Sequence, residues 1–113
     1  MGRLSRGEVW LVDLNPIRGH EQAGLRPALI VSEDEFNYGP SGLIVVVPIS
    51  SREKGIPLHV ETVPPEGGLR VRSFIMSEHV RSISKDRLTR RLGSIRAQTL
   101  AEVDGRLSIL LGL

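Results

Sequence analysis

The sequence predicts a mainly β domain of the α+β class: a small, strongly bent antiparallel sheet or half-open barrel with a C-terminal helix packed on it. Two patterns lead to this prediction. Up to about residue 92, short apolar runs rich in Val, Ile and Leu are separated by glycine and proline, as in strands joined by turns. Beyond residue 96 the apolar side chains recur with a helical period. The length of 113 residues predicts a single domain, residues 1–113.

The first two strands are predicted on either side of a polar loop. Side chains alternate along residues 8–14, and an Asn-Pro pair ends the run. Residues 27–32 are apolar on both faces, which predicts a central strand. Residues 19–27, which lie in the loop between them and lead into the second strand, carry four polar side chains, His20, Glu21, Gln22 and Arg26. Such a loop, held by strands at both ends, is a common place for a site, although a solvated hairpin loop accounts for the same pattern.

The rest of the chain is predicted as short strands followed by one helix. Residues 33–42 are expected to form a loop, and residues 43–47 a buried strand that Pro48 ends. A charged turn follows at residues 52–55. Further strands are predicted at 58–63, 73–76, 80–83 and 88–92, with turns at 64–68 and 84–86. The helix is expected at 96–111, with an apolar face formed by Leu100, Val103, Leu107, Leu110 and Leu111.

Composition excludes some classes of protein and leaves others open. Thirteen of the 15 basic residues are arginine, whose planar fork suits phosphate, so nucleic-acid binding is allowed. A solvated surface of mixed charge accounts for the same counts equally well. The absence of cysteine excludes disulfides and thiol chemistry. The sequence has no apolar run of about 20 residues and no apolar signal region, which predicts a cytoplasmic protein without membrane association.

Motif spacing gives little support to metal or nucleophile chemistry. The three histidines, His20, His59 and His79, lie in different segments without metal-ligand spacing, so no metal site is expected. The sequence contains neither a Gly-x-Ser-x-Gly elbow nor a phosphate-binding loop of the Gly-x-x-x-x-Gly-Lys type.

Arg26 and Ser50 are the remaining candidates. If the second and third strands pair antiparallel, the start of one meets the end of the other, and these residues become neighbours. A guanidinium beside a hydroxyl suits a phosphodiester, because both can donate to charged phosphoryl oxygens. The alternative is that Arg26 makes a surface salt bridge and Ser50 caps a turn. Spacing alone favours that alternative.

Several blocks of sequence together carry a family resemblance. The most specific is Glu-Gln-x-Gly-x-Arg-Pro at residues 21–27. Weaker blocks follow in order along nearly the whole chain, at 6–16, 47–51, 55–57 and 78–83, and they end in the apolar C-terminal helix. In this order they resemble the MazF/PemK family of toxins, the endoribonuclease halves of bacterial toxin–antitoxin pairs.

The resemblance implies an SH3-like small barrel that forms a homodimer. It also implies metal-independent, cofactor-free cleavage of single-stranded RNA, mRNA included, by attack of the 2′-hydroxyl. The family's catalytic arginine and threonine correspond to Arg26 and Ser50; the serine keeps the hydroxyl but lacks the methyl group. The family's motif glutamate corresponds to Glu21. The expected supporting RNA-binding residues are Glu21, Gln22, Ser51, Arg52 and Lys54.

The resemblance also implies partners and leaves alternatives. The expected partners are RNA, a cognate antitoxin protein and a second copy of the chain, with DNA reached only through the antitoxin. The dimer interface is expected at Leu107, Leu110 and residues 74–80. A toxin of the same fold that poisons DNA gyrase without catalysis is the alternative function, and an inactive RNA-binding module is a third. The intact Arg26 motif disfavours the gyrase poison.

Overall fold

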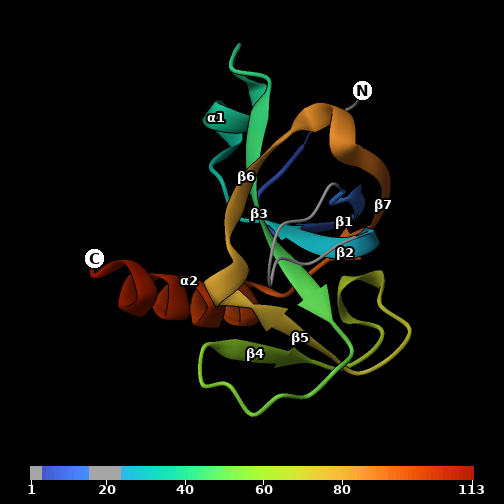
Figure 1. Ribbon diagram of the computed structural model, residues 1–113, viewed down its shortest axis with the longest axis vertical. Coiled ribbons are helices and arrows are strands. Elements are labelled where there is room, and N and C mark those ends of the chain that lie inside the picture. Colours follow the sequence, from blue (N-terminus) through green and yellow to red (C-terminus); the bar gives the residue numbers. More distant parts are fainter. Residues whose placement is uncertain (1–3, 16–23) are drawn as a thin grey trace.

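The computed structural model describes residues 4–15 and 24–113 (Figure 1). Within these residues the chain forms a seven-stranded sheet, in which all the strand pairs are antiparallel. The strands are β1 (Glu8–Asp13), β2 (Leu25–Ile30), β3 (Leu43–Ser50), β4 (His59–Thr62), β5 (Ser73–Met76), β6 (Arg81–Ser84) and β7 (Leu88–Ser94). The helices are α1 (Asp34–Tyr38) and α2 (Ala97–Leu111), with single 3₁₀ turns at Glu66–Gly68, Ser77–His79 and Lys85–Arg87. The mainly β fold with a C-terminal helix is therefore confirmed.

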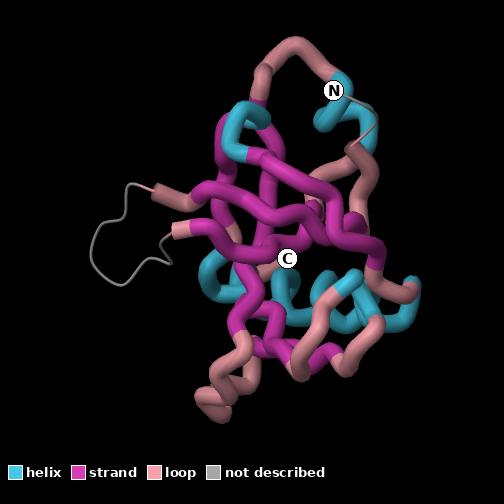
Figure 2. Tube along the Cα trace, turned by 90° about the vertical axis from the view of Figure 1, so that its right-hand side faces the viewer, coloured by secondary structure: helices cyan, strands magenta, loops and turns pink. Residues whose placement is uncertain are grey.

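The long strand β3 is the element about which the sheet bends. One edge of β3 pairs with β2, while the other edge pairs first with β6 and then with β5. The strand order is β4-β5-β3-β2-β1-β7, with β6 beside β3. In Figure 2 the strands run in two crossing directions. No pairing joins β4 to β7 in the described residues, so the sheet is strongly bent but does not close into a barrel.

Two apolar clusters form the core, one on each face of the sheet, because strand side chains alternate between faces. The cluster beside α2 includes Val9, Leu29, Val47, Ile49, Ile75 and Val103. The other includes Leu4, Val12, Ala28, Ile30, Ile44 and Val46. Figure 1 shows α2 in red beside β4 and the turn before β6. Burying a side chain such as Val103 contributes about 1.5–3 kcal/mol, so this face secures the helix.

Two predictions for the middle of the chain are wrong. Residues 33–42 are not all loop, because α1 covers Asp34–Tyr38. Its first turn carries Asp34 and Glu35, where carboxylates are favourable, and the buried Asn37 donates to the carbonyl of Ser32 at 3.0 Å. Pro48 does not end the third strand, which continues to Ser50.

Proline is tolerated inside β3 because its missing N–H does not face β2. The N–H of Val31 donates to the carbonyl of Val45 at 3.0 Å, which sets which residues hydrogen-bond across this pair. Backbone groups along a strand point alternately to its two edges. Pro48, opposite Ala28, lies three positions after Val45, so its nitrogen points to the edge away from β2. There it falls in the gap between β6, which pairs up to Val46, and β5, which pairs from Ile49.

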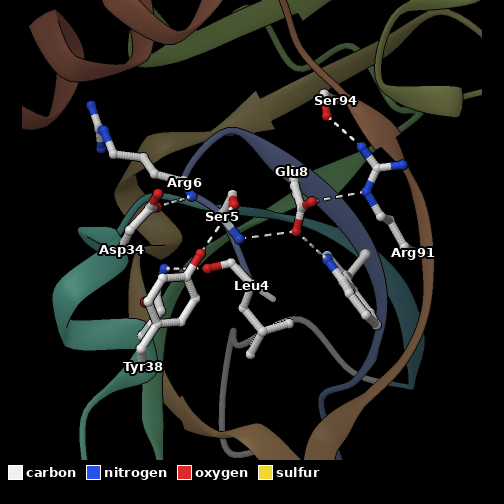
Figure 3. Close-up of polar contacts among 10 residues, drawn as sticks. Leu4, Ser5, Arg6, Glu8, Asp34, Tyr38, Arg91 and Ser94 are labelled. Atoms are coloured by element: carbon white, nitrogen blue, oxygen red, sulfur yellow. Dashed lines mark hydrogen bonds and ion pairs between the residues drawn. The ribbon is translucent and has the colours of Figure 1, made fainter. Parts of the chain in front are cut away.

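The N-terminal segment joins three parts of the molecule (Figure 3). Glu8 accepts hydrogen bonds from Ser5 N (3.0 Å), Trp10 Nε1 (3.1 Å) and Arg91 Nε (2.9 Å). The backbone N–H of Arg6 donates to Asp34 at 2.8 Å, which holds α1 against β1. These contacts anchor the edge strand β7 to β1. In the same described ranges, no helix has the length and apolar character needed to cross a membrane.

Candidate active site

The ends of β2 and β3 carry the two residues singled out by their chemistry. The expected antiparallel pairing of these strands is confirmed, with Ala28 opposite Pro48. Arg26 lies two positions before Ala28 and Ser50 two positions after Pro48. Continued strand alternation therefore places both side chains on the same face of the sheet. Arg26 is exposed, whereas Ser50 is buried.

The backbone of Arg26 is held by its neighbour strand β1, where it lies opposite Val12. Two hydrogen bonds secure the base of the same hairpin: Leu14 N to Gly24 O at 2.9 Å, and Gly24 N to the side-chain oxygen of Asn15 at 3.0 Å. The arginine thus projects from a fixed backbone. The predicted supporting residues Glu21 and Gln22, and His20, lie outside the described residues.

Ser50 lies where β3 leaves its pairing with β2 and begins to pair with β5. Its backbone is opposite Phe74, and its Oγ accepts a hydrogen bond from the N–H of Arg52 at 3.1 Å. A hydroxyl that accepts this bond keeps its own proton for donation to another oxygen. The side chain is only 7% exposed, so its rotamer is restricted by packing.

An exposed segment follows Ser50 and brings further polar groups to this end of the sheet. All residues from 51 to 57 are exposed, and no regular secondary structure is formed there. Three of the predicted supporting residues lie on it, namely Ser51, Arg52 and Lys54. Arg52 and Lys54 give the segment two positive charges, and Glu53 lies between them.

A charged cluster beside this segment was not found from the sequence. Arg72 contacts Glu53 through Nη1 at 3.2 Å and Nη2 at 3.4 Å, and its Nε donates to Glu61. The hydrogen bond from Arg72 lowers the pKa of Glu61. A pocket of about 190 Å³ opens here, lined by Glu53, Gly55, Ile56, His59, Glu61 and Phe74. The partners of Arg72 lie 11 and 19 positions away, too far for a local pattern to link them.

His59 and His79 take structural positions. His59 Nε2 lies 2.6 Å from Glu78 Oε2, and the His59 side chain is only 4% exposed. His79 Nε2 lies 3.9 Å from the same carboxylate oxygen. In residues 4–15 and 24–113, no three His, Asp or Glu side chains gather closely enough to hold a metal ion. The His59–Glu78 pair joins β4 to the turn after β5.

Fold and site together define a class: small bent-sheet proteins that carry an arginine and a buried hydroxyl at the ends of their central strands. Family comparison gives a particular assignment within it. Residues 5–111 match the model of the PemK-like, MazF-like toxin of type II toxin-antitoxin systems. The chain belongs to this PemK/MazF family of toxins.

Related proteins and structures agree with the family assignment. The chain is 36% identical to the endoribonuclease MazF of Staphylococcus epidermidis, over 97% of this chain and 92% of the relative. It is 39% identical to the endoribonuclease MazF9 of Mycobacterium tuberculosis, over 97% and 98%. A crystal structure of MazF from Deinococcus radiodurans matches with a TM-score of 0.89 and 35% identity, over the full length of both chains. A MazE–MazF structure from the same organism matches with a TM-score of 0.80 and 36% identity, over 100% of this chain and 99% of the other.

Proposed function

We propose that this protein is an endoribonuclease toxin that cleaves single-stranded RNA, including mRNA, at short sequence motifs. The observation that carries the proposal is the position of Arg26 and Ser50 on one face at the adjoining ends of β2 and β3. Relatives that share 36% and 39% identity over nearly the whole chain are named endoribonucleases. The exposed Arg52 and Lys54 beside Ser50 support binding of a polyanion.

The proposed reaction uses a nucleophile that the substrate supplies. The 2′-oxygen of the RNA forms a bond to the adjacent phosphorus, and the bond from phosphorus to the 5′-oxygen breaks. The 2′-hydroxyl loses a proton and the departing 5′-oxygen gains one, so the products are a 2′,3′-cyclic phosphate and a 5′-hydroxyl. Because the substrate supplies the nucleophile, no metal-bound water is needed to attack the phosphorus, and the proposed reaction uses neither a metal nor a cofactor.

Arg26 and Ser50 take different roles in this reaction. Arginine holds its proton too tightly to act as a good acid or base. Its guanidinium instead stabilises the charge that develops on the phosphoryl oxygens. Ser50 donates its O–H to the same group while its oxygen accepts the N–H of Arg52. Glu21, Gln22, Ser51, Arg52 and Lys54 are assigned to RNA binding around this centre.

Partners follow from the same proposal. A cognate antitoxin would neutralise the toxin in the cytoplasm, and DNA would be bound only through that antitoxin. A homodimer is supported by exposed apolar side chains at the end of α2: Ile109, Leu110, Leu111 and Leu113. Leu110 was also expected from the sequence, whereas the other candidates are less suitable: Phe74, Ile75 and Met76 are buried within the chain and Leu107 packs against the core.

The experiment is an RNA cleavage assay in excess EDTA. The purified protein should cut a long unstructured RNA, leave duplex RNA largely intact, and produce 2′,3′-cyclic phosphate and 5′-hydroxyl ends. Arg26→Ala should abolish the activity, and Arg26→Lys should be severely impaired because a point charge cannot reproduce the planar fork.

Circular dichroism should show both Arg26 variants folded, since an exposed arginine adds little to stability. Cleavage that appears only on addition of a divalent metal would reject the mechanism. The absence of products from a varied RNA pool would reject the function and favour the gyrase poison or the inactive RNA-binding module.

A further inference from the structure

The segment 51–57 carries RNA-binding candidates but has little of its own to fix its shape. Every residue in it is exposed, and it forms neither helix nor strand. Two arginine side chains from elsewhere in the described fold form hydrogen bonds with it. Arg106 donates to the carbonyl of Pro57 at 3.1 Å, at its far end. Arg72 contacts Glu53, which lies between Arg52 and Lys54.

Arg72 holds Glu53 in a geometry that restricts motion. Its Nη1 and Nη2 approach the two carboxylate oxygens of Glu53 at 3.2 and 3.4 Å, an arrangement with two parallel contacts. Its Nε donates to Glu61, and its Cζ lies 5.0 Å from the centroid of the Phe74 ring. Isolated surface ion pairs contribute little to stability, but an arginine that makes two parallel contacts within a network of charges contributes more.

Two residues that Arg72 contacts lie in one row with Ser50, the candidate catalytic serine. Ser50 of β3 is opposite Phe74 of β5, and Phe74 is opposite Glu61 of β4. Directly opposed residues in antiparallel strands share a face, so these three form one row across the sheet. Arg72 contacts Phe74 and Glu61 of this row. Through Glu53 it also holds the segment that begins directly after Ser50.

We propose that Arg72 is a positioning residue for RNA binding. It clamps segment 51–57 over the Ser50–Phe74–Glu61 row, so that Ser51, Arg52 and Lys54 meet RNA beside the scissile phosphate. This inference rests on the proposed function. The two carboxylates of Glu53 and Glu61 outweigh the single positive charge of Arg72, so this residue supplies geometry rather than net attraction for the polyanion.

Limited proteolysis tests the clamp without any RNA. Trypsin cuts after Arg52 and Lys54, and such cuts require the segment to leave its native shape. Arg72→Ala should accelerate cleavage at these two bonds by roughly 3- to 10-fold, as expected for losing an ion-pair network with a cation–π contact. Arg70→Ala is the matched control, because it removes the same charge from a nearby exposed position that has no ion-pair partner among the described residues. Equal cleavage rates in both variants would overturn the clamp.

Kinetics and binding test the role in RNA recognition. Arg72→Ala should raise KM, and the Kd for an RNA made uncleavable by a 2′-deoxy substitution, by roughly 3- to 10-fold, with kcat changed much less. Arg70→Ala should change KM far less. An unchanged KM in Arg72→Ala, or a fall in kcat alone, would overturn the proposal. If the wild-type protein neither binds nor cuts RNA, the proposed function fails, whereas the trypsin result still reports on the clamp.

A chemical tether separates geometry from direct contact by the guanidinium. The natural chain has no cysteine, so Glu53→Cys with Arg72→Cys gives the protein a single reactive pair. Cross-linking this double variant with a short bis-maleimide should restore RNA affinity and trypsin resistance relative to the same protein left open. If the tether restores trypsin resistance but not affinity, Arg72 acts on RNA by its own charge and the positioning role is wrong. Should Arg72→Ala fail to fold, Glu53→Gln replaces it in the trypsin assay with the same expected acceleration.

Discussion

At the residue scale, Ser50 stands where the family resemblance leads us to expect threonine. Ser50→Ala should lower the cleavage rate by roughly 10- to 1000-fold, the effect of losing one donor to a charged transition state. Ser50→Thr should keep or raise the rate, because the added methyl group restricts the side-chain rotamer. Initial rates on one short RNA substrate, with urea unfolding as a check of folding, give both values. A wild-type rate in Ser50→Ala would mean that the hydroxyl has no role in catalysis and only accepts the hydrogen bond from the N–H of Arg52.

Some site residues could be predicted from the sequence and others could not. The neighbouring places of Arg26 and Ser50 could be, because antiparallel pairing of two consecutive strands is a simple geometric rule, and that pairing is observed. Arg72 could not, because its partners Glu53 and Glu61 come from separate strands and turns. The His59–Glu78 pair, 19 positions apart, escaped detection for the same reason. Contacts that depend on tertiary folding leave no spacing pattern in the sequence.

At the element scale, features that depend on local sequence could be predicted, whereas features that depend on the pairing of the whole sheet could not. The alternating run at 8–14 and the apolar runs at 43–47 and 73–76 correspond to β1, β3 and β5. The end of β3 was misplaced because proline ends a strand only where its missing N–H would be needed. In this fold Pro48 lies at a gap between two partner strands, and only the pairing of the whole sheet shows that.

The turn at Glu66–Gly68 packs against β7 so closely that it requires glycine on both sides. A Cβ on Gly68 would lie 1.9 Å from the carbonyl oxygen of Leu92, and one on Gly93 would lie 2.6 Å from the nitrogen of Gly68. Gly68 also has a φ of +70°. Gly68→Ala should therefore lower the free energy of unfolding by about 3 kcal/mol, because backbone atoms cannot move aside as side chains do. Urea titration gives the value.

Gly105 in α2 provides the control for that measurement. It lies in the helix interior, and beyond the helix's own nearby backbone a Cβ there would meet no described atom within 4 Å. Gly105→Ala should raise the free energy of unfolding by about 0.5–1 kcal/mol, because alanine loses less backbone entropy in a helix. A stability loss in both variants would show that α2 does not keep this conformation. A neutral Gly68→Ala would contradict the close packing of the turn on β7.

At the scale of the whole molecule, two carboxylates join segments that are distant in the chain. Burial alone would raise the pKa of Glu8, but hydrogen bonds from Ser5, Trp10 and Arg91 outweigh it and lower the pKa below the usual 4.5. Burial likewise opposes the hydrogen bonds that Glu66 receives from Thr99 and Arg96, and the net pKa is again lowered. Glu8 thus joins β1 to β7, and Glu66 joins its 3₁₀ turn to the start of α2.

These lowered pKa values predict how stability depends on pH. A carboxylate whose pKa falls on folding adds stability that is complete above its unfolded pKa and is lost as pH falls through the folded value. The free energy of unfolding should therefore be flat near neutral pH and decline below the usual carboxyl value of 4.5. Urea titrations from about pH 7 to about pH 3 measure the decline.

Glu8→Gln isolates one contribution to this decline. Glutamine keeps an oxygen that accepts from Ser5 and Trp10, but it carries no charge for Arg91 and cannot be protonated at low pH. The variant should be less stable than the wild type near neutral pH, and the difference between them should shrink as pH falls below 4.5. Glu102→Gln, on the exposed surface of α2, should follow the wild-type curve closely. A Glu8→Gln deficit that persists unchanged at low pH would mean that shape, not charge, makes Glu8 the anchor between β1 and the edge of the sheet.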